Sequence, residues 1–177
     1  GGLLSAGEET IASVLMGIDA EREIQVTRIL EGLREGRLPA RGARELVLGS
    51  EAARQLGIEL GAEIVVVAPA ADGSLGNDLF TLVGIFRTGM VAIDRTYALL
   101  PYQDLQFLLA LDPERIHELV VRVPQVWTAP EVARSTTAAL AWAENVTVEP
   151  WTDFRAELRD YVMHAESFNV VSVGLVF

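Results

Sequence analysis

The sequence predicts an α+β fold in which a strand-rich subdomain is inserted into a subdomain of alternating strands and helices. Half of the 177 residues are hydrophobic, which is sufficient for a well-packed core. Residues 40–111 contain short apolar runs separated by turns rich in glycine and aspartate, a pattern typical of paired strands. Residues 1–20 and 113–165 instead alternate strand-like and helix-like patterns. A middle that differs from both flanks indicates that one subdomain is inserted into another.

Two strand–helix pairs are predicted near the start of the chain. A strand over 10–18, apolar on both faces, precedes a helix over 20–36. The residues whose spacing predicts this helix are Val26, Ile29, Leu30 and Leu33. A short strand over 45–49 then precedes a two-turn helix over 51–57, for which Ser50 is the expected N-cap.

The middle of the chain predicts a β-hairpin, followed by a strand and a helix. Apolar runs over 62–69 and 79–87 are the two hairpin strands, and residues 70–78 between them have the composition of a long turn. Gly84 lies inside the second strand, where it predicts a bulge or a close backbone approach. A strand over 96–100 leads directly into the helix. The apolar stripe of that helix is Tyr102, Leu105, Leu108 and Leu109.

The last third of the chain predicts a strand–helix–strand unit. Strands are expected over 117–124 and 145–151, with a helix over 128–143 between them. Such a unit ordinarily pairs its strands in parallel through a right-handed crossover. Thr128 and Glu131 have the spacing of a capping box at the start of the helix.

The final segment predicts an amphipathic helix over 152–166 that continues into an apolar end, Ser167 to Phe177. This end is shorter than the ~20 residues that span a bilayer. It is therefore interpreted either as a buried strand or as the first turns of a membrane helix. The absence of a helix breaker between the two parts favours the membrane helix.

Composition and charge exclude several classes of protein. The formal net charge of −11 argues against nucleic-acid binding and against a basic patch for anionic lipid. The chain has no cysteine, so disulfides and thiolate chemistry are excluded. His117 and His164 lack a metal-ligand pattern, and nothing in the sequence identifies Asp94 and Asp112 as a catalytic carboxylate pair. We expect no cofactor, no metal and no catalytic residue, and we interpret the chain as a binding or mechanical domain rather than an enzyme.

Four stretches of the chain carry a family resemblance by their order and spacing. They are MGIDAEREIQVTRILEGLREGRL at 16–38, LVLGSEAARQLGIELGAEIVVVAP at 46–69, FTLVGIFRTGMVAIDRTYALLPYQDLQFLLAL at 80–111 and VTVEPWTDF at 146–154. Together they resemble the periplasmic domain of the MacB/LolC/LolE-like ABC transporter permeases. One departure is Ala20, which stands where the family has a proline after Gly-Ile/Val-Asp.

The resemblance implies a porter-like part and an inserted, strand-rich Sabre-like part. Residues 1–20 and 113–166 would form the porter-like part, 21–112 the Sabre-like part, and 167–177 the start of a transmembrane helix. The domain would lie in the periplasm, on a permease anchored in the inner membrane. Its implied partners are a separate ABC ATPase subunit, a second permease subunit in a homo- or heterodimer, and a periplasmic lipoprotein carrier. Motion driven by the ATPase would extract or transport a substrate such as a lipoprotein.

The spacing of the motifs is closer to the lipoprotein-releasing branch than to the MacB-like efflux branch. In the former, a long hairpin tip serves as a hook for the carrier, whereas the tip here, Pro69–Asp78, is short. A LolE-like role or a homodimeric permease therefore fits better. The candidate partner-contact residues at the tip are Asp72, Gly73, Ser74 and Leu75. The alternatives are an efflux permease domain and a stand-alone soluble module that binds a protein or peptide.

Overall fold

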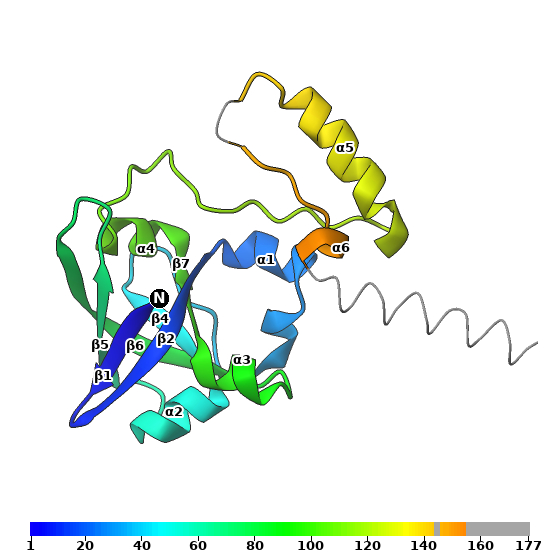
Figure 1. Cartoon of the computed structure of the whole chain (residues 1–177). Helices are drawn as coiled ribbons and strands as arrows, with labels where there is room; N and C mark the ends of the chain where they lie inside the picture. Colours follow the sequence, from blue (N-terminus) through cyan, green and yellow to red (C-terminus); the bar gives the residue numbers. More distant parts are fainter. Residues whose placement is uncertain (144–145, 155–177) are drawn as a thin grey trace, which may run out of the picture. The chain divides into compact units, whose positions relative to one another are not determined.

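The computed structural model describes residues 1–143 and 146–154, which belong to two compact units (Figure 1). The first unit is Gly1–Val120, and the second begins at Val121. All strands of the described residues belong to the first unit, so the α+β class predicted from the sequence is confirmed there.

The first unit contains seven strands within the described residues. They are β1 (Gly2–Ala6), β2 (Glu9–Ile18), β3 (Leu33–Gly36), β4 (Glu45–Gly49), β5 (Glu63–Pro69), β6 (Leu75–Phe86) and β7 (Tyr97–Pro101). Its helical segments are α1 (Ala20–Val26), the 3-10 turn η1 (Ile29–Gly32), α2 (Ser50–Leu56), α3 (Val91–Thr96) and α4 (Tyr102–Leu108).

The sheet closes on itself. Its strand order is β3-β6-β4-β7-β2-β1-β5, and β5 also pairs with β6. Six of the described strands therefore form a ring, and β3 pairs with the last residues of β6, beyond the part of β6 that pairs with β5. The pairs β2–β7 and β4–β6 are parallel, and the other pairs are antiparallel. The six ring strands are each paired on both sides, and β3 is the edge strand of the described sheet.

The main hydrophobic core lies inside this ring. Alternate residues of the strands point inward, as the two-residue period of a strand requires. The largest of these fully buried side chains are Leu4, Leu46, Leu48, Ile64, Val66, Phe80, Leu82 and Leu100. Helix α2 adds Leu56 and helix α4 adds Leu105 and Leu108 to the same cluster. Burial of each large apolar side chain contributes about 1.5–3 kcal/mol, so this cluster dominates the stability of the unit.

A bulge at Gly84 brings Phe86 into a second hydrophobic cluster, separate from the main core. The register of β6 against β4 shifts there: Leu82 lies opposite Leu46, but Gly84 lies opposite Val47. Phe86, beyond the shift, packs with Val47 in this second cluster. A Cβ at Gly84 would also collide with the carbonyl oxygen of Arg37. The bulge and the close approach expected at this glycine are thus confirmed.

Most sequence-predicted strands of the first unit are present, but two predictions there are wrong and two elements were not predicted. The predicted helix over 20–36 ends at Val26, because Leu33–Gly36 pair with β6 as strand β3. Tertiary pairing overrides helical spacing here. Ser50 is the first residue of α2 rather than its N-cap, which is Gly49. Strand β1 and helix α3 have no counterpart among the predicted elements.

The second unit contains little regular structure among its described residues. It has the 3-10 turn η2 (Val126–Thr128), helix α5 (Ala129–Ala139) and the turn α6 (Trp151–Phe154). The ring nitrogen of Trp151 donates to the carbonyl oxygen of Val126 at 2.9 Å, which ties α6 to η2. Thr128 makes no side-chain cap, so the predicted capping box is not formed; its hydroxyl instead donates to the carbonyl oxygen of Gln125.

The predicted strands over 117–124 and 145–151 are not formed in the part of the chain that the structure describes, so of the strand–helix–strand unit only the helix is present. Leu119 and Val121 are 75% and 65% exposed, and a strand without a paired neighbour is not stable. The rest of the predicted helix over 152–166, and the apolar segment 167–177, lie outside the described residues. Among the helices that are described, none combines the length and apolar content needed to cross a bilayer.

Candidate functional site

The β5–β6 hairpin ends in a short, ordered tip. The two strands pair as far as Pro69 and Leu75, so the tip is Ala70–Ser74 and is shorter than the predicted 70–78. Within it, the backbone N–H of Ala70 donates to the carbonyl oxygen of Ser74 at 2.9 Å. Gly73 has a positive φ of 84°, a conformation that glycine adopts without strain.

Asp72 stabilises this tip from within. Its Oδ1 accepts a hydrogen bond from the backbone N–H of Ser74 at 2.9 Å. Hydrogen bonding from the Ser74 side chain, and then from its backbone, holds the pKa of Asp72 below its ordinary value. The carboxylate therefore stays ionised and places a negative charge at the end of the hairpin.

The end of helix α4 contacts the tip. The backbone N–H of Ala71 donates to the carbonyl oxygen of Leu109, directly after α4, at 2.8 Å. Gly76 lies so close to the carbonyl oxygen of Leu108 that a Cβ at this position would collide with it. The tip is thus attached to the end of α4.

A mixed apolar and charged cluster lies beside the tip on this surface. Phe107 of α4 is 72% exposed, and the guanidinium of Arg44 lies 5.6 Å from the centroid of its ring. Arg44 also contacts Asp78 of β6, with its Nη1 3.1 Å from Oδ1. Leu75, the first residue of β6, is 67% exposed. We call Leu75, Asp78, Arg44, Asp104, Phe107 and the tip residues Ala70–Ser74 the tip surface.

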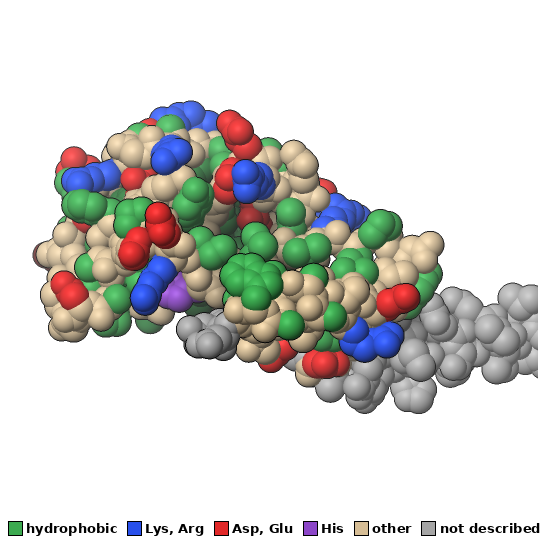
Figure 2. Space-filling model, turned by 90° about the horizontal axis from the view of Figure 1, so that it is seen from above, with side chains coloured by type: hydrophobic (Ala, Val, Ile, Leu, Met, Phe, Trp, Pro, Cys, Tyr) green, Lys and Arg blue, Asp and Glu red, His purple; other side chains and the backbone are tan. Residues whose placement is uncertain are grey.

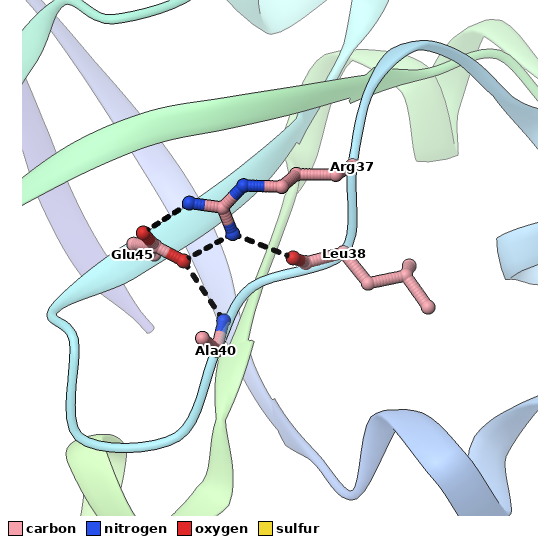
Figure 3. Close-up of polar contacts among 4 residues, drawn as sticks. All are labelled: Arg37, Leu38, Ala40 and Glu45. Carbon is pink, nitrogen blue, oxygen red and sulfur yellow. Dashed lines mark hydrogen bonds and ion pairs between the residues drawn. The ribbon is translucent and has the colours of Figure 1, made fainter.

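The loop that carries Arg44 is closed by an ion pair at its base (Figure 3). Arg37 donates to both carboxylate oxygens of Glu45, from Nη1 at 2.6 Å and from Nη2 at 2.5 Å. The backbone N–H of Ala40 donates to the same carboxylate at 2.9 Å, and Arg37 Nη1 also donates to the carbonyl oxygen of Leu38. Hydrogen bonding from Arg37 lowers the pKa of Glu45, and the pKa of Arg37 is raised by the same contact.

Asp104 links the loop to α4. Its Oδ2 accepts a hydrogen bond from the backbone N–H of Gly42 at 3.2 Å. Partial burial raises the pKa of Asp104, and the Gly42 N–H and the charge of Arg44 oppose that rise. Arg44 itself has a positive φ of 52°, which is uncommon outside glycine and indicates that the loop conformation is imposed by its contacts.

The tip surface combines exposed apolar side chains with charged ones. Two exposed apolar side chains are surrounded by three carboxylates and one arginine, a composition typical of a contact surface. Among the described residues, no group of three or more His, Asp or Glu is placed to hold a metal ion. On the face drawn in Figure 2, acidic and basic side chains are interspersed with hydrophobic ones, and its coloured residues form no basic stripe.

The structure brings the four predicted contact residues together. Asp72, Gly73 and Ser74 lie in the tip, and Leu75 begins the adjoining strand. The sequence reasoning missed Phe107, Arg44 and Asp104. The exposure of Phe107 could have been predicted, because this aromatic residue lies outside the apolar stripe of its helix. Nothing in the sequence places Arg44 or Asp104 beside the hairpin.

The other candidates considered from the sequence are separate from this surface. Asp94 is buried and accepts a hydrogen bond from the backbone N–H of Thr88, at the corner after β6. Asp112 accepts a hydrogen bond from the backbone N–H of Glu114. The two carboxylates therefore have separate structural roles. His117 is exposed, and His164 lies outside the described residues.

Comparison with known proteins identifies relatives of the chain. The family model described as the MacB-like periplasmic core domain matches residues 2–139. The lipoprotein-releasing system transmembrane protein LolC of Neisseria meningitidis serogroup B is 28% identical over 116 residues, which are 63% of this chain and 28% of that protein. LolC of Xylella fastidiosa strain Temecula1 is 26% identical over 116 residues, 62% of this chain and 28% of that protein. The chain thus spans less than a third of the length of these relatives.

Proposed function

The chain belongs to the family of MacB-like periplasmic core domains, and we propose that it is the periplasmic domain of an ABC transporter permease subunit. The observation that carries the proposal is the family match over residues 2–139, which includes every strand of the described residues. The domain would lie in the periplasm, on a permease anchored in the inner membrane. In this arrangement ATP is hydrolysed by a separate ATPase subunit or domain.

The role proposed for the domain is mechanical. A ring in which each strand is hydrogen-bonded on both sides deforms little, so the first unit is suited to move as one body. Motion driven by the ATPase would reach it through the membrane segments of the permease and of a second permease subunit. The tip surface would then approach or leave a partner as the permease changes conformation.

The proposed cargo is a lipoprotein. The support is the names of the LolC relatives, which describe a lipoprotein-releasing system. In this role the tip surface is the contact site for a second permease subunit or a periplasmic lipoprotein carrier. The four predicted residues Asp72, Gly73, Ser74 and Leu75 would lie in that contact.

The subdomain assignment is part of the same proposal. Residues 1–20 with 113–166 would be the porter-like part, 21–112 the Sabre-like part, and 167–177 the start of a transmembrane helix. The boundary after residue 20 falls at the start of α1, directly after β2, and β2 shares the closed ring with strands of 21–112. The two parts would therefore be joined through backbone hydrogen bonds and not only through linkers.

A reconstitution experiment tests the proposal. The full permease that contains this chain is reconstituted with its ATPase into proteoliposomes that hold a fluorescent lipoprotein. Release of the lipoprotein into the soluble fraction on addition of ATP is the expected result, and an ATPase variant that cannot hydrolyse ATP is the matched control. ATP-driven export of a small molecule without lipoprotein release would assign the permease to efflux, the second candidate, which the MacB-like description of the matched family favours. Loss of both activities would overturn the proposal.

A further inference from the structure

Gln106 of α4 is a buried polar side chain that holds the chain segment after its own helix. It is 7% exposed, and its Nε2 donates one hydrogen bond to the carbonyl oxygen of Arg115 at 2.7 Å and another to that of Pro113 at 3.2 Å. The side-chain amide thus uses one N–H for each carbonyl. Because loss of either bond leaves a buried N–H unpaired, the side chain is a strong restraint on the segment that it contacts.

The segment that Gln106 holds is a hydrogen-bonded turn over residues 112–115. The backbone N–H of Arg115 donates to the carbonyl oxygen of Asp112, and the backbone N–H of Glu114 donates to Oδ1 of Asp112, each at 2.9 Å. Aspartate at the first position and proline at the second are residues that such a turn favours. The turn is therefore favoured by its own sequence, and we call Gln106 together with residues 112–115 the latch.

Gln106 also takes part in the end of helix α4, which is a Schellman motif. The backbone N–H of Leu111 donates to the carbonyl oxygen of Gln106 at 2.9 Å, and that of Ala110 donates to the carbonyl oxygen of Phe107 at 3.2 Å. Ala110 has a positive φ of 49°, in a position that glycine usually occupies. Alanine is strained in this conformation, so contacts on either side impose it. The latch is the contact on the C-terminal side.

The same helix end holds the hairpin tip. The backbone N–H of Ala71 donates to the carbonyl oxygen of Leu109, directly after α4, at 2.8 Å. Leu105 and Leu108 anchor the last turn of α4 in the main core. This helix end therefore contacts the tip through Leu109 and residues 112–115 through Gln106, and the two contacts are about one helical turn apart.

We infer that Gln106 is a positioning residue that couples the chain leaving α4 to the hairpin tip. A displacement of residues 112–115 is transferred through the Gln106 side chain to the end of α4, and from Leu109 to Ala71. The chain is held in this way to the end of the turn, and the next residue, Ile116, is 60% exposed and lies in no helix or strand. Resting on the proposed function, in which motion of the permease reaches the first unit, this coupling would carry that motion to the tip surface.

Hydrogen exchange measured by NMR on the full 177-residue chain tests this coupling, because two amides of the tip have different partners. The backbone N–H of Ala71 bonds to Leu109, whereas that of Gly73 bonds to the carbonyl oxygen of Ala70 inside the tip. Gln106→Leu keeps a buried side chain of similar size but removes its donors. It should raise the exchange rate of the Ala71 amide at least about tenfold and that of the Gly73 amide less than about twofold. A general loss of stability would instead raise both rates alike.

Two further variants sharpen the exchange experiment. Gln103→Leu makes the same chemical change at a half-buried position of the same helix and is the matched control, in which neither amide should change. Asp112→Ala loosens the turn at an exposed residue, should also raise the Ala71 rate, and keeps the test decisive if Gln106→Leu does not fold. The coupling is overturned if Asp112→Ala and a folded Gln106→Leu both exchange as the wild type does, or if the Ala71 and Gly73 rates rise together.

Trypsin gives an independent readout of the latch, because it cleaves after arginine and the carbonyl oxygen of Arg115 is bonded to Gln106. In Gln106→Leu, cleavage between Arg115 and Ile116 should be at least about tenfold faster than in the wild type. Cleavage after Arg122, beyond the latch, should keep its rate. An unchanged rate of cleavage after Arg115 would overturn the latch itself. Neither experiment involves transport, so failure of this coupling and failure of the proposed function are distinguishable.

Discussion

Asp94 accepts two hydrogen bonds from Thr88, one from its backbone N–H at 2.7 Å and one from its hydroxyl at 2.8 Å. A third, from the backbone N–H of Gly89, reaches the other carboxylate oxygen at 3.3 Å. The carboxylate is 3% exposed and thus holds the corner between β6 and α3 almost without contact with water. A buried carboxylate with several donors is a strong local restraint, because removal of the acceptor leaves those donors unsatisfied.

Asp94→Ala should destabilise the first unit by about 1–3 kcal/mol, because the corner loses the acceptor of its hydrogen bonds from the half-buried Thr88 and from Gly89. Urea unfolding followed by circular dichroism measures the change. Glu59→Ala, at an exposed acidic residue, is the matched control and should shift the unfolding free energy by less than about 0.5 kcal/mol. Equal effects of the two substitutions would show that the Asp94 hydrogen bonds do not stabilise the corner.

Gly36 and Gly42 allow a matched test of how a close backbone approach affects stability when glycine is replaced by alanine. Their φ angles are +76° and +72°, but a Cβ at Gly36 would collide with the carbonyl oxygen of Val83, whereas a Cβ at Gly42 would meet nothing within 4 Å. Gly42→Ala should lower the free energy of unfolding by about 1–2 kcal/mol, because alanine is strained in the left-handed conformation. Gly36→Ala should cost clearly more, because β3 must also move away from β6. The same thermal shift for both variants would contradict this reading of the β3–β6 contact.

The pairing of Glu45 with Arg37 predicts a pH-dependent contribution to stability. Hydrogen bonding from Arg37 lowers the folded-state pKa of Glu45 below the ordinary 4.5, so its ionised form is favoured by folding. The contribution is therefore present above pH 4.5 and is lost as the pH falls through the lowered pKa. Compared with Glu45→Gln, the wild type should have the higher urea midpoint at pH 7, and the difference should shrink towards pH 3. A difference that is independent of pH would show that the ion pair does not contribute.

The tip surface predicts variants that separate stability from function. Leu75→Asp and Phe107→Asp change side chains that are 67% and 72% exposed, so the unfolding free energy should change by less than about 0.5 kcal/mol. If the tip surface contacts a partner, each variant should lower ATP-dependent release by the reconstituted permease several-fold. Leu60→Asp, at an exposed leucine on the turn before β5, is the control. Full activity of both tip variants would remove this surface from the mechanism.

Local sequence patterns predicted the hairpin of β5 and β6 and the strands β2, β4 and β7. They also predicted a helix over 51–57, and α2 ends at Leu56 with Gly57 as a left-handed C-cap. These elements follow from turn chemistry and from the two-residue period of strands, which act within a few residues. The candidate site was predicted only at the hairpin tip. Arg44 and Asp104 reach it from a loop and a helix, and no local pattern encodes that proximity.

The wrong secondary-structure predictions have a common cause, which is strand pairing between segments far apart in the sequence. Residues 33–36 have helical spacing, but they become β3 because β6 offers them hydrogen bonds. Residues 117–124 have the composition of a strand, but no described segment pairs with them. Secondary structure in these places is decided by the presence or absence of a partner, which the local sequence does not contain.

By itself, the sequence determined the α+β class, the family and the position of the hairpin, because these depend on composition and on the order of local motifs. Only the tertiary structure decided that the sheet closes through β5 and β6 and that Asp94 holds the corner after β6. Ring closure depends on contacts between residues far apart in the chain, and the burial of Asp94 depends on contacts across a turn. These contacts stabilise the protein only once the strands have paired.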